Sequence, residues 1–143
     1  MCSQPDVHSR FPGFVMLDHI GLVVSEYDRS KRFYQTALAP LSITLVLELT
    51  PDQTGLGSHA GFGAADKPFF WIGNHGRPVQ GVHVAFVAES RRAVDAFYRE
   101  ALRIGGRDNG KPGLRPHYHA NYYGAFVLDP DGNNIEAVCH KAE

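Results

Sequence analysis

Two stretches of alternating large and small positions, residues 16–24 and 81–88, predict a pair of matching strands. The large apolar side chains stand at even positions: Ile20, Leu22, Val24, Val82, Val84 and Phe86. The odd positions carry small residues or valine around a histidine, His19 in the first stretch and His83 in the second. Since successive side chains in a strand point to opposite faces, each strand should have one packing face and one open face with a histidine.

The two histidines belong to an internal repeat with an offset of 64 residues. The same offset relates FYQTAL at residues 33–38 to FYREAL at residues 97–102, so strand, histidine and helix recur in register. We expect both hexapeptides to lie on amphipathic helices, because their apolar residues are spaced three and four apart.

Capping residues indicate where these helices begin. Ser25, with Asp28 three residues later, resembles a capping box, and the helix that it opens should stop at Pro40. Ser90 predicts the cap of the second helix, which should reach about residue 104.

Shorter apolar runs predict the remaining strands, at residues 41–49, 58–63, 69–72, 122–128 and 134–140. In the first of these the odd positions are all leucine or isoleucine and should share one face. Asp-Pro-Asp-Gly-Asn at 129–133 predicts a hairpin turn that would place Phe126 beside Glu136, and residues 107–121 are loop-rich. Each copy therefore reads βαβββ, although the strand after the second helix is poorly marked. One copy alone cannot cover its sheet, so we expect two copies to pair.

The predicted fold class is α+β, with two tandem βαβββ units forming a cupped, mostly antiparallel sheet that has its helices on the outside. The expected organisation is an N-terminal arm at 1–15 and a single domain at 16–142, with unit one at 16–75 and unit two at 80–141.

Composition narrows the function classes. The 143 residues carry a net charge of −1, which argues against a nucleic-acid partner or a polybasic membrane surface. No apolar run is long enough to span a bilayer, and the N-terminus lacks a signal-peptide pattern. Two cysteines, Cys2 and Cys139, are too few for a disulfide framework, so we expect a cytoplasmic protein.

Three residues carry the candidate chemistry: His19, His83 and Glu136. Glu136 lies in the last predicted strand and points away from its packing side, as the two histidines do. Two imidazoles and a carboxylate bind Fe(II), Mn(II), Zn(II) or Ni(II) and leave positions open for a substrate. A lone strand histidine is more often structural, but two at equivalent places in a repeat favour ligation of a divalent metal.

The stretches LDHIGLVVSEYDRSKRFYQTAL, GVHVAF and FVLDPDGNNIEAV resemble the vicinal oxygen chelate superfamily over about residues 16–140. That superfamily holds glyoxalase I, bleomycin-resistance proteins, fosfomycin-resistance transferases, methylmalonyl-CoA epimerase and extradiol dioxygenases. The resemblance implies metal ligands at His19, His83 and Glu136. It also implies a homodimer in which the site forms within one chain or between chains.

Two departures bear on the activity that the resemblance implies. Glyoxalase I has a further carboxylate ligand in unit one, where the repeat places Ile72 or Trp71, so glyoxalase I itself is disfavoured. The extradiol signature is matched by His119, the turn and Glu136, but its tyrosine position holds Phe126. Tyr122 or Tyr123 are candidates to replace that phenol.

The loop at residues 115–123 is dense in polar aromatic groups and forms a candidate substrate-facing lip. Arg115 would bind an anionic group, His119 and Tyr123 would serve as acid or base, and Tyr122, Phe126 and Trp71 would contact substrate. The alternatives are a solvated loop whose tyrosines pack on the sheet and, for Trp71, a place in the core.

The leading hypothesis is a metal-dependent enzyme of dioxygenase, lyase or isomerase type that acts on a small oxygenated molecule. The alternative is a metal-free protein of the bleomycin-resistance kind, which would sequester a ligand in its cleft. Retention of all three candidate ligands favours the enzyme.

Overall fold

The computed structural model describes residues 17–143, so the predicted N-terminal arm lies outside the described residues. Unit one contains β1 Ile20–Val23, α1 Tyr27–Leu38, the short 3₁₀ helix η2 Ala39–Leu41, β2 Thr44–Leu49, α2 Pro51–Thr54, β3 His59–Ala64 and β4 Lys67–Gly73. Unit two contains β5 His83–Val87, α3 Arg91–Arg103, β6 Arg107–Leu114, β7 Tyr123–Leu128 and β8 Asn134–Cys139.

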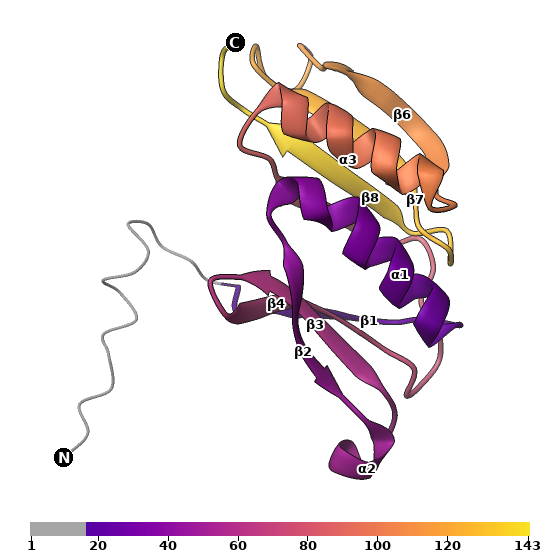
Figure 1. Ribbon diagram of the computed structural model, residues 1–143. Helices are drawn as coiled ribbons and strands as arrows, with labels where there is room; N and C mark the ends of the chain where they lie inside the picture. Colours follow the sequence, from indigo (N-terminus) through magenta and orange to yellow (C-terminus); the bar gives the residue numbers. More distant parts are fainter. Residues whose placement is uncertain (1–16) are drawn as a thin grey trace, which may run out of the picture.

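Each unit forms its own four-stranded sheet, in the orders β1-β4-β3-β2 and β5-β8-β7-β6. The first strand of each unit pairs in parallel with the last, and the other pairs are antiparallel. The helices α1 and α3 lie side by side and contact each other across the two units (Figure 1). This is the predicted α+β arrangement of tandem βαβββ units.

The core lies between the sheets and these two helices. Leu22 and Val24 of unit one and Phe86 of unit two are almost fully buried, whereas His19, His83 and Val87 are exposed. The packing and open faces predicted from the alternation are therefore confirmed. Phe33, Tyr34 and Phe97, from the repeated hexapeptides, are also fully buried.

The predicted cap of the first helix was wrong. The N-cap of α1 is Glu26 and makes no side-chain cap, and the Ser25 hydroxyl instead donates to Asp131 in unit two. The strand expected after the second helix, poorly marked within a loop-rich stretch, is β6, which pairs with β7 despite three glycines and prolines in its eight residues. The strand tolerates them because its register shifts twice, at Asp108/Gly110 and Gly110/Gly113. The predicted cap at Ser90 is confirmed, with the backbone N–H of Ala93 donating to Ser90 Oγ over 3.1 Å.

The alternation predicted for residues 41–49 does not hold to its end. A register shift between Leu45 and Leu47 in β2 interrupts it, and Leu47 is exposed. Leu41, the first residue of the predicted strand, instead ends η2, with Pro40 inside that turn.

The predicted hairpin turn joins the two units. Asp129 is buried there and accepts a hydrogen bond of 2.5 Å from the hydroxyl of Tyr34 on α1. Asp129 also accepts the backbone N–H groups of Asp131 and Asn133, so the turn is held from within as well. Asp131 receives the Ser25 contact.

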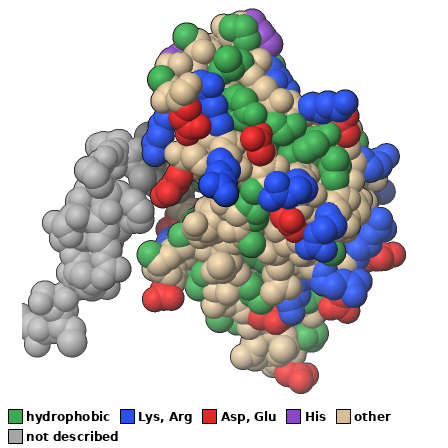
Figure 2. Space-filling model, turned by 45° about the horizontal axis from the view of Figure 1, so that its top comes forward, with side chains coloured by type: hydrophobic (Ala, Val, Ile, Leu, Met, Phe, Trp, Pro, Cys, Tyr) green, Lys and Arg blue, Asp and Glu red, His purple; other side chains and the backbone are tan. Residues whose placement is uncertain are grey.

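Basic and acidic side chains are interspersed on the face drawn in Figure 2, as a net charge of −1 suggests. Across residues 17–143 no helix is long and apolar enough to cross a membrane.

Candidate functional site

Glu136 is a buried carboxylate in the middle of β8, with 1% of its surface exposed. Its neighbours in the sheet are Ala85 on β5 and Phe126 on β7. The hairpin turn sets this register, and the sequence had placed Phe126 beside Glu136 for that reason. A carboxylate in such a place is costly unless its oxygens have partners.

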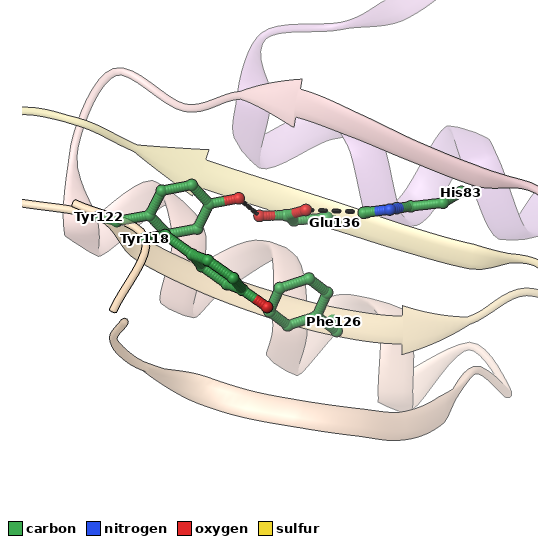
Figure 3. A pocket seen from close by; sticks show the side chains of 5 residues that line it. All are labelled: His83, Tyr118, Tyr122, Phe126 and Glu136. Atoms are coloured by element: carbon green, nitrogen blue, oxygen red, sulfur yellow. Dashed lines mark hydrogen bonds and ion pairs between the residues drawn. The ribbon is translucent and has the colours of Figure 1, made fainter. Parts of the chain in front are cut away.

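Both carboxylate oxygens of Glu136 are satisfied by side chains. His83 Nε2 lies 2.9 Å from Oε2, and the hydroxyl of Tyr122 donates to Oε1 (Figure 3). A carboxylate has no hydrogen to donate, so the contact with His83 places a hydrogen on Nε2. The imidazole itself is half exposed, with 51% of its side-chain surface accessible.

These groups line a pocket of about 380 Å³ on the open face of the second sheet, formed by His83, Tyr118, Tyr122, Phe126 and Glu136 (Figure 3). Three of the five are aromatic rings, and Tyr118 and Tyr122 meet edge to face at 5.1 Å between centroids. The pocket thus offers apolar walls with an imidazole and a carboxylate along one side, a composition typical of small-molecule sites.

Burial and the hydrogen bond to Glu136 raise the pKa of Tyr122 to about 12. The phenol therefore remains protonated at neutral pH and continues to donate to the carboxylate. Tyr122 is held from outside the pocket by His140, whose ring meets it edge to face at 5.2 Å.

His19 lies on the other sheet, immediately before β1. Its Nδ1 is 2.6 Å from Asp18 Oδ1, and Lys67 Nζ lies 2.9 Å from Asp18 Oδ2. These two partners lower the pKa of Asp18, His19 first and Lys67 second. With 58% of its side-chain surface exposed, His19 stands on the open face of the first sheet.

One chain does not bring the three predicted ligands together. The structure pairs His83 with Glu136 and leaves His19 apart; no group of three His, Cys, Asp or Glu residues suited to a metal occurs within residues 17–143. Because both helices cover the packing sides, His19 and the His83–Glu136 pair each lie on the open face of their own sheet.

The strand register identifies the unit-one position equivalent to Glu136. Ala85 opposes Glu136, and Gly21, 64 residues earlier, opposes Trp71. Of the two positions considered from the sequence, Trp71 is therefore the equivalent one, and Ile72 is buried in the core. The open face of the first sheet carries an indole at this point and no carboxylate.

Trp71 lies flat against its own sheet. A Cβ added at Gly61 would meet the far edge of the indole at 2.8 Å, so only glycine leaves room for the ring there. On the other side, a Cβ at Gly21 would be 3.8 Å from Trp71 Cβ, an ordinary contact. Trp71 does not line the pocket beside Glu136.

Arg115 and Phe126 pack together at the edge of the pocket, with the guanidinium 5.5 Å from the ring centroid. Arg115 also donates to the backbone oxygens of Gly113 and Lys111, at 2.9 and 2.7 Å. Its hydrogen-bonding capacity is thus partly used within β6, so it supports the wall that Phe126 forms.

Two further predicted residues lie away from the pocket. His119 is exposed in the loop, where its Nδ1 accepts the backbone N–H of Asn121 at 3.1 Å. Tyr123 points to the opposite face of β7 and donates to Asp95 on α3 at 2.7 Å. Between the two tyrosines considered as replacement phenols, the structure brings Tyr122 and not Tyr123 to Glu136.

Sequence reasoning missed two residues that touch the candidate ligands or the pocket, Tyr118 and Asp18, and a third, Lys67, that contacts Asp18. Tyr118 was noted only as part of an aromatic loop, although its spacing of four from Tyr122 could have indicated a turn that brings the two rings together. Asp18 stands next to His19 in the sequence, but Lys67 is brought to it by the parallel pairing of β1 with β4. No local signal predicts that pairing.

The paired units and the open-face histidines define a protein of the vicinal oxygen chelate fold. The family model described as "Glyoxalase/Bleomycin resistance protein/Dioxygenase superfamily" matches residues 16–137, and the chain belongs to this superfamily. A search of proteins with curated descriptions finds no match.

Solved structures share the fold. A glyoxalase/bleomycin resistance protein from Albidiferax ferrireducens T118 is 26% identical, with a TM-score of 0.72 over 89% of this chain and 100% of its own. Glyoxalase I from Zea mays is 23% identical, with a TM-score of 0.67 over 87% of this chain and 46% of its own. A lactoylglutathione lyase from Agrobacterium tumefaciens is 18% identical, with a TM-score of 0.61 over 90% and 96%. The latter two similarities bear on the fold alone.

The donor set suits a divalent metal. His83 and Glu136 already lie within 2.9 Å of each other at the pocket, and an imidazole nitrogen and a carboxylate oxygen are ordinary ligands of Fe(II), Mn(II), Zn(II) and Ni(II). His19 offers a third nitrogen, from the first sheet.

Proposed function

We propose that this chain is the subunit of a homodimeric, metal-dependent enzyme that acts on a small oxygenated substrate. In this proposal His83 and Glu136 of one chain and His19 of the partner subunit hold a divalent ion. A metal bound there supplies Lewis acidity to a substrate that presents two neighbouring oxygens. Reactions of the dioxygenase, lyase or isomerase type remain the candidates.

The observation that carries the proposal is the division of the ligand set. His83 and Glu136 meet on the open face of one sheet, while His19 stands exposed on the open face of the other. A second copy related by two-fold symmetry would present the complementary open face to each of them, and a two-fold interface repeats any such contact. Two equivalent sites would then form per dimer.

The chain's own residues would prepare the site and bind the substrate. Tyr122 orients the Glu136 carboxylate by donating its one hydroxyl hydrogen to Oε1, and its phenol oxygen would accept a hydrogen bond from a substrate hydroxyl. Tyr118 and Phe126 offer aromatic walls against which a substrate could pack. Trp71 would extend this wall from the partner subunit's first sheet.

Glyoxalase I activity is disfavoured by the residue at the fourth ligand position. The register gives Trp71 as the counterpart of Glu136, and an indole neither binds a metal nor abstracts a proton. The active-site set that we propose is therefore two histidines and one carboxylate.

Metal analysis of protein purified without chelator tests the proposal. We expect about one divalent ion per chain, and its loss in His19→Ala, His83→Ala and Glu136→Gln. The matched control is His75→Ala, which removes an exposed histidine on the linker between the units and should leave the metal content unchanged. A metal-free wild-type protein that also gains no ion on dialysis against Zn²⁺, Mn²⁺ or Fe²⁺ would overturn it.

A second candidate is a metal-free protein that sequesters a ligand, and one observation favours it. Both oxygens of Glu136 already have hydrogen-bond partners within the chain, so the buried carboxylate needs no ion to be satisfied. In this case chelator-treated protein would bind an aromatic ligand at one molecule per site without converting it. Adding metal would leave the affinity for that ligand unchanged.

A further inference from the structure

Asp18 contacts both His19 and Lys67. Neither Asp18 nor Lys67 belongs to the proposed set of metal ligands. Its Oδ1 lies 2.6 Å from His19 Nδ1 and 3.0 Å from Lys67 Nζ, and its Oδ2 lies 2.9 Å from the same ammonium. Both oxygens of the carboxylate are thus engaged, and Lys67 restrains its rotation. Because β1 and β4 run in parallel from neighbouring starts, Lys67 at the beginning of β4 reaches Asp18, two residues before β1.

The contact between Asp18 and His19 selects one form of the imidazole. A carboxylate accepts hydrogen bonds and donates none, so the hydrogen of this bond belongs to His19 Nδ1. In the neutral ring the lone pair is then on Nε2, the nitrogen remote from Asp18. A histidine ligand is oriented in this way when its second nitrogen donates to a carboxylate.

His83 is in the opposite condition. Without metal, its Nε2 faces Glu136 and carries the hydrogen of that contact, which a metal bound by His83 and Glu136 would displace. The two histidines occupy equivalent places in the repeat, yet only His19 has an acidic residue immediately before it; the residue before His83 is Val82. The repeat therefore does not account for Asp18.

We propose that Asp18, restrained by Lys67, is a positioning residue that holds His19 in the Nδ1–H form with its Nε2 lone pair free for a metal. The benefit of this arrangement rests on the proposed metal site. Which imidazole nitrogen carries the hydrogen, however, is a property of the metal-free chain. Because this pair is largely exposed in one chain, we expect an effect on affinity at the lower end of what such partners give, about tenfold.

The first test is long-range ¹H–¹⁵N NMR of the metal-free protein at about pH 9, where an unperturbed imidazole is neutral. His19 is identified as the signal lost in His19→Gln. We expect the Nδ1–H pattern in the wild type and a shift toward the Nε2–H form, which an unconstrained histidine side chain prefers, in Asp18→Ala. Asp18→Asn keeps an acceptor oxygen and should restore the Nδ1–H form. An unchanged pattern in Asp18→Ala would overturn the inference.

The second test is titration with Zn²⁺ alone, against a chromogenic chelator. We expect affinity about tenfold lower in Asp18→Ala, a smaller loss in Lys67→Met, and recovery to within about threefold of wild type in Asp18→Asn. The matched control is Lys31→Met, which removes the 2.7 Å pair with Glu48 elsewhere in the same unit and should leave Zn²⁺ affinity unchanged. Equal losses in Lys31→Met and Lys67→Met would show a general charge effect and overturn the role of Lys67.

The two tests separate this inference from the proposed function. If the wild type binds no metal, the proposed function fails while the NMR pattern still decides whether Asp18 controls the imidazole. If the metal binds and neither the pattern nor the affinity responds to Asp18→Ala, the positioning role fails and the metal site stands.

Discussion

The hydroxyl of Tyr34 on α1 donates a 2.5 Å hydrogen bond to Asp129, which lies 95 residues later in the hairpin turn of the second unit. Both residues are buried, and burial together with the neighbouring Asp129 raises the pKa of Tyr34 well above its ordinary value. The phenol stays protonated, so this bond between the units persists throughout the neutral range. The bond also fastens the hairpin turn to the first unit, and this turn sets the register that places Glu136 beside Phe126.

Tyr34→Phe should therefore destabilise the protein by about 1.5 to 3 kcal/mol, because it leaves a buried carboxylate with one donor fewer. The measurement is the free energy of unfolding from urea denaturation. Tyr27→Phe is the matched control on the same helix: it removes an exposed 2.8 Å bond to Glu48 within unit one and should cost less than about 1 kcal/mol. Equal losses would show that the contact between units has no special weight.

The proposed division of the metal site between chains predicts complementation. Co-expressed His19→Ala and Glu136→Gln chains should recover about one quarter of the wild-type metal capacity, because half of the dimers are mixed and each mixed dimer has one intact site. His83→Ala mixed with Glu136→Gln should recover none, since both defects lie in the same half of the site. Failure of both mixtures would place the site within one chain.

Trp71 is the only tryptophan, so its fluorescence reports on the first sheet. Gly61→Ala should displace the indole, shift its emission and cost about 1 kcal/mol, because the new Cβ would meet the ring at 2.8 Å. Gly21→Ala, on the other side of the same residue, should change neither property, since its Cβ would lie at an ordinary 3.8 Å. Identical spectra for the two variants would contradict the flat placement of the ring.

The free energy of unfolding at high pH should depend on the hydrogen bond that Tyr123 donates. Its hydrogen bond to Asp95, aided by burial, raises its pKa to about 12 from the ordinary 10.0. A pKa that is higher in the folded state gives a contribution that is complete below about pH 10 and is lost as the pH rises toward about 12. The difference in unfolding free energy between wild type and Tyr123→Phe should therefore shrink from pH 9 to pH 11.

The control for this pH series is Ser90→Ala, which removes the cap of α3, the helix that carries Asp95. The cap involves no titrating side chain, so its loss of about 1 kcal/mol should be the same at both pH values. If the stability difference from wild type shrinks equally for Ser90→Ala and Tyr123→Phe, the loss of stability at alkaline pH belongs to some group other than Tyr123.

Local patterns were enough to predict the elements and faces that follow from period and repetition. The alternation around His19 and His83 determined which side chains pack and which face outward, because a period of two leaves no other arrangement once one face is buried. The hairpin turn likewise placed Phe126 beside Glu136. By contrast, β6 carries too many glycines and prolines for any local signal, and it forms because β7 offers an edge to pair with.

The sequence by itself determined two repeated units with a histidine on each open face and a carboxylate on the last strand. Only the tertiary structure decided which of these groups meet. In the folded chain His83 and Tyr122 both contact Glu136, whereas Tyr123 faces the helix α3. His19 lies by the other sheet, where Asp18 contacts both His19 and Lys67. Parity along one strand is a local property, whereas the neighbours of a side chain depend on strand order and register, which chain segments far apart in sequence create together.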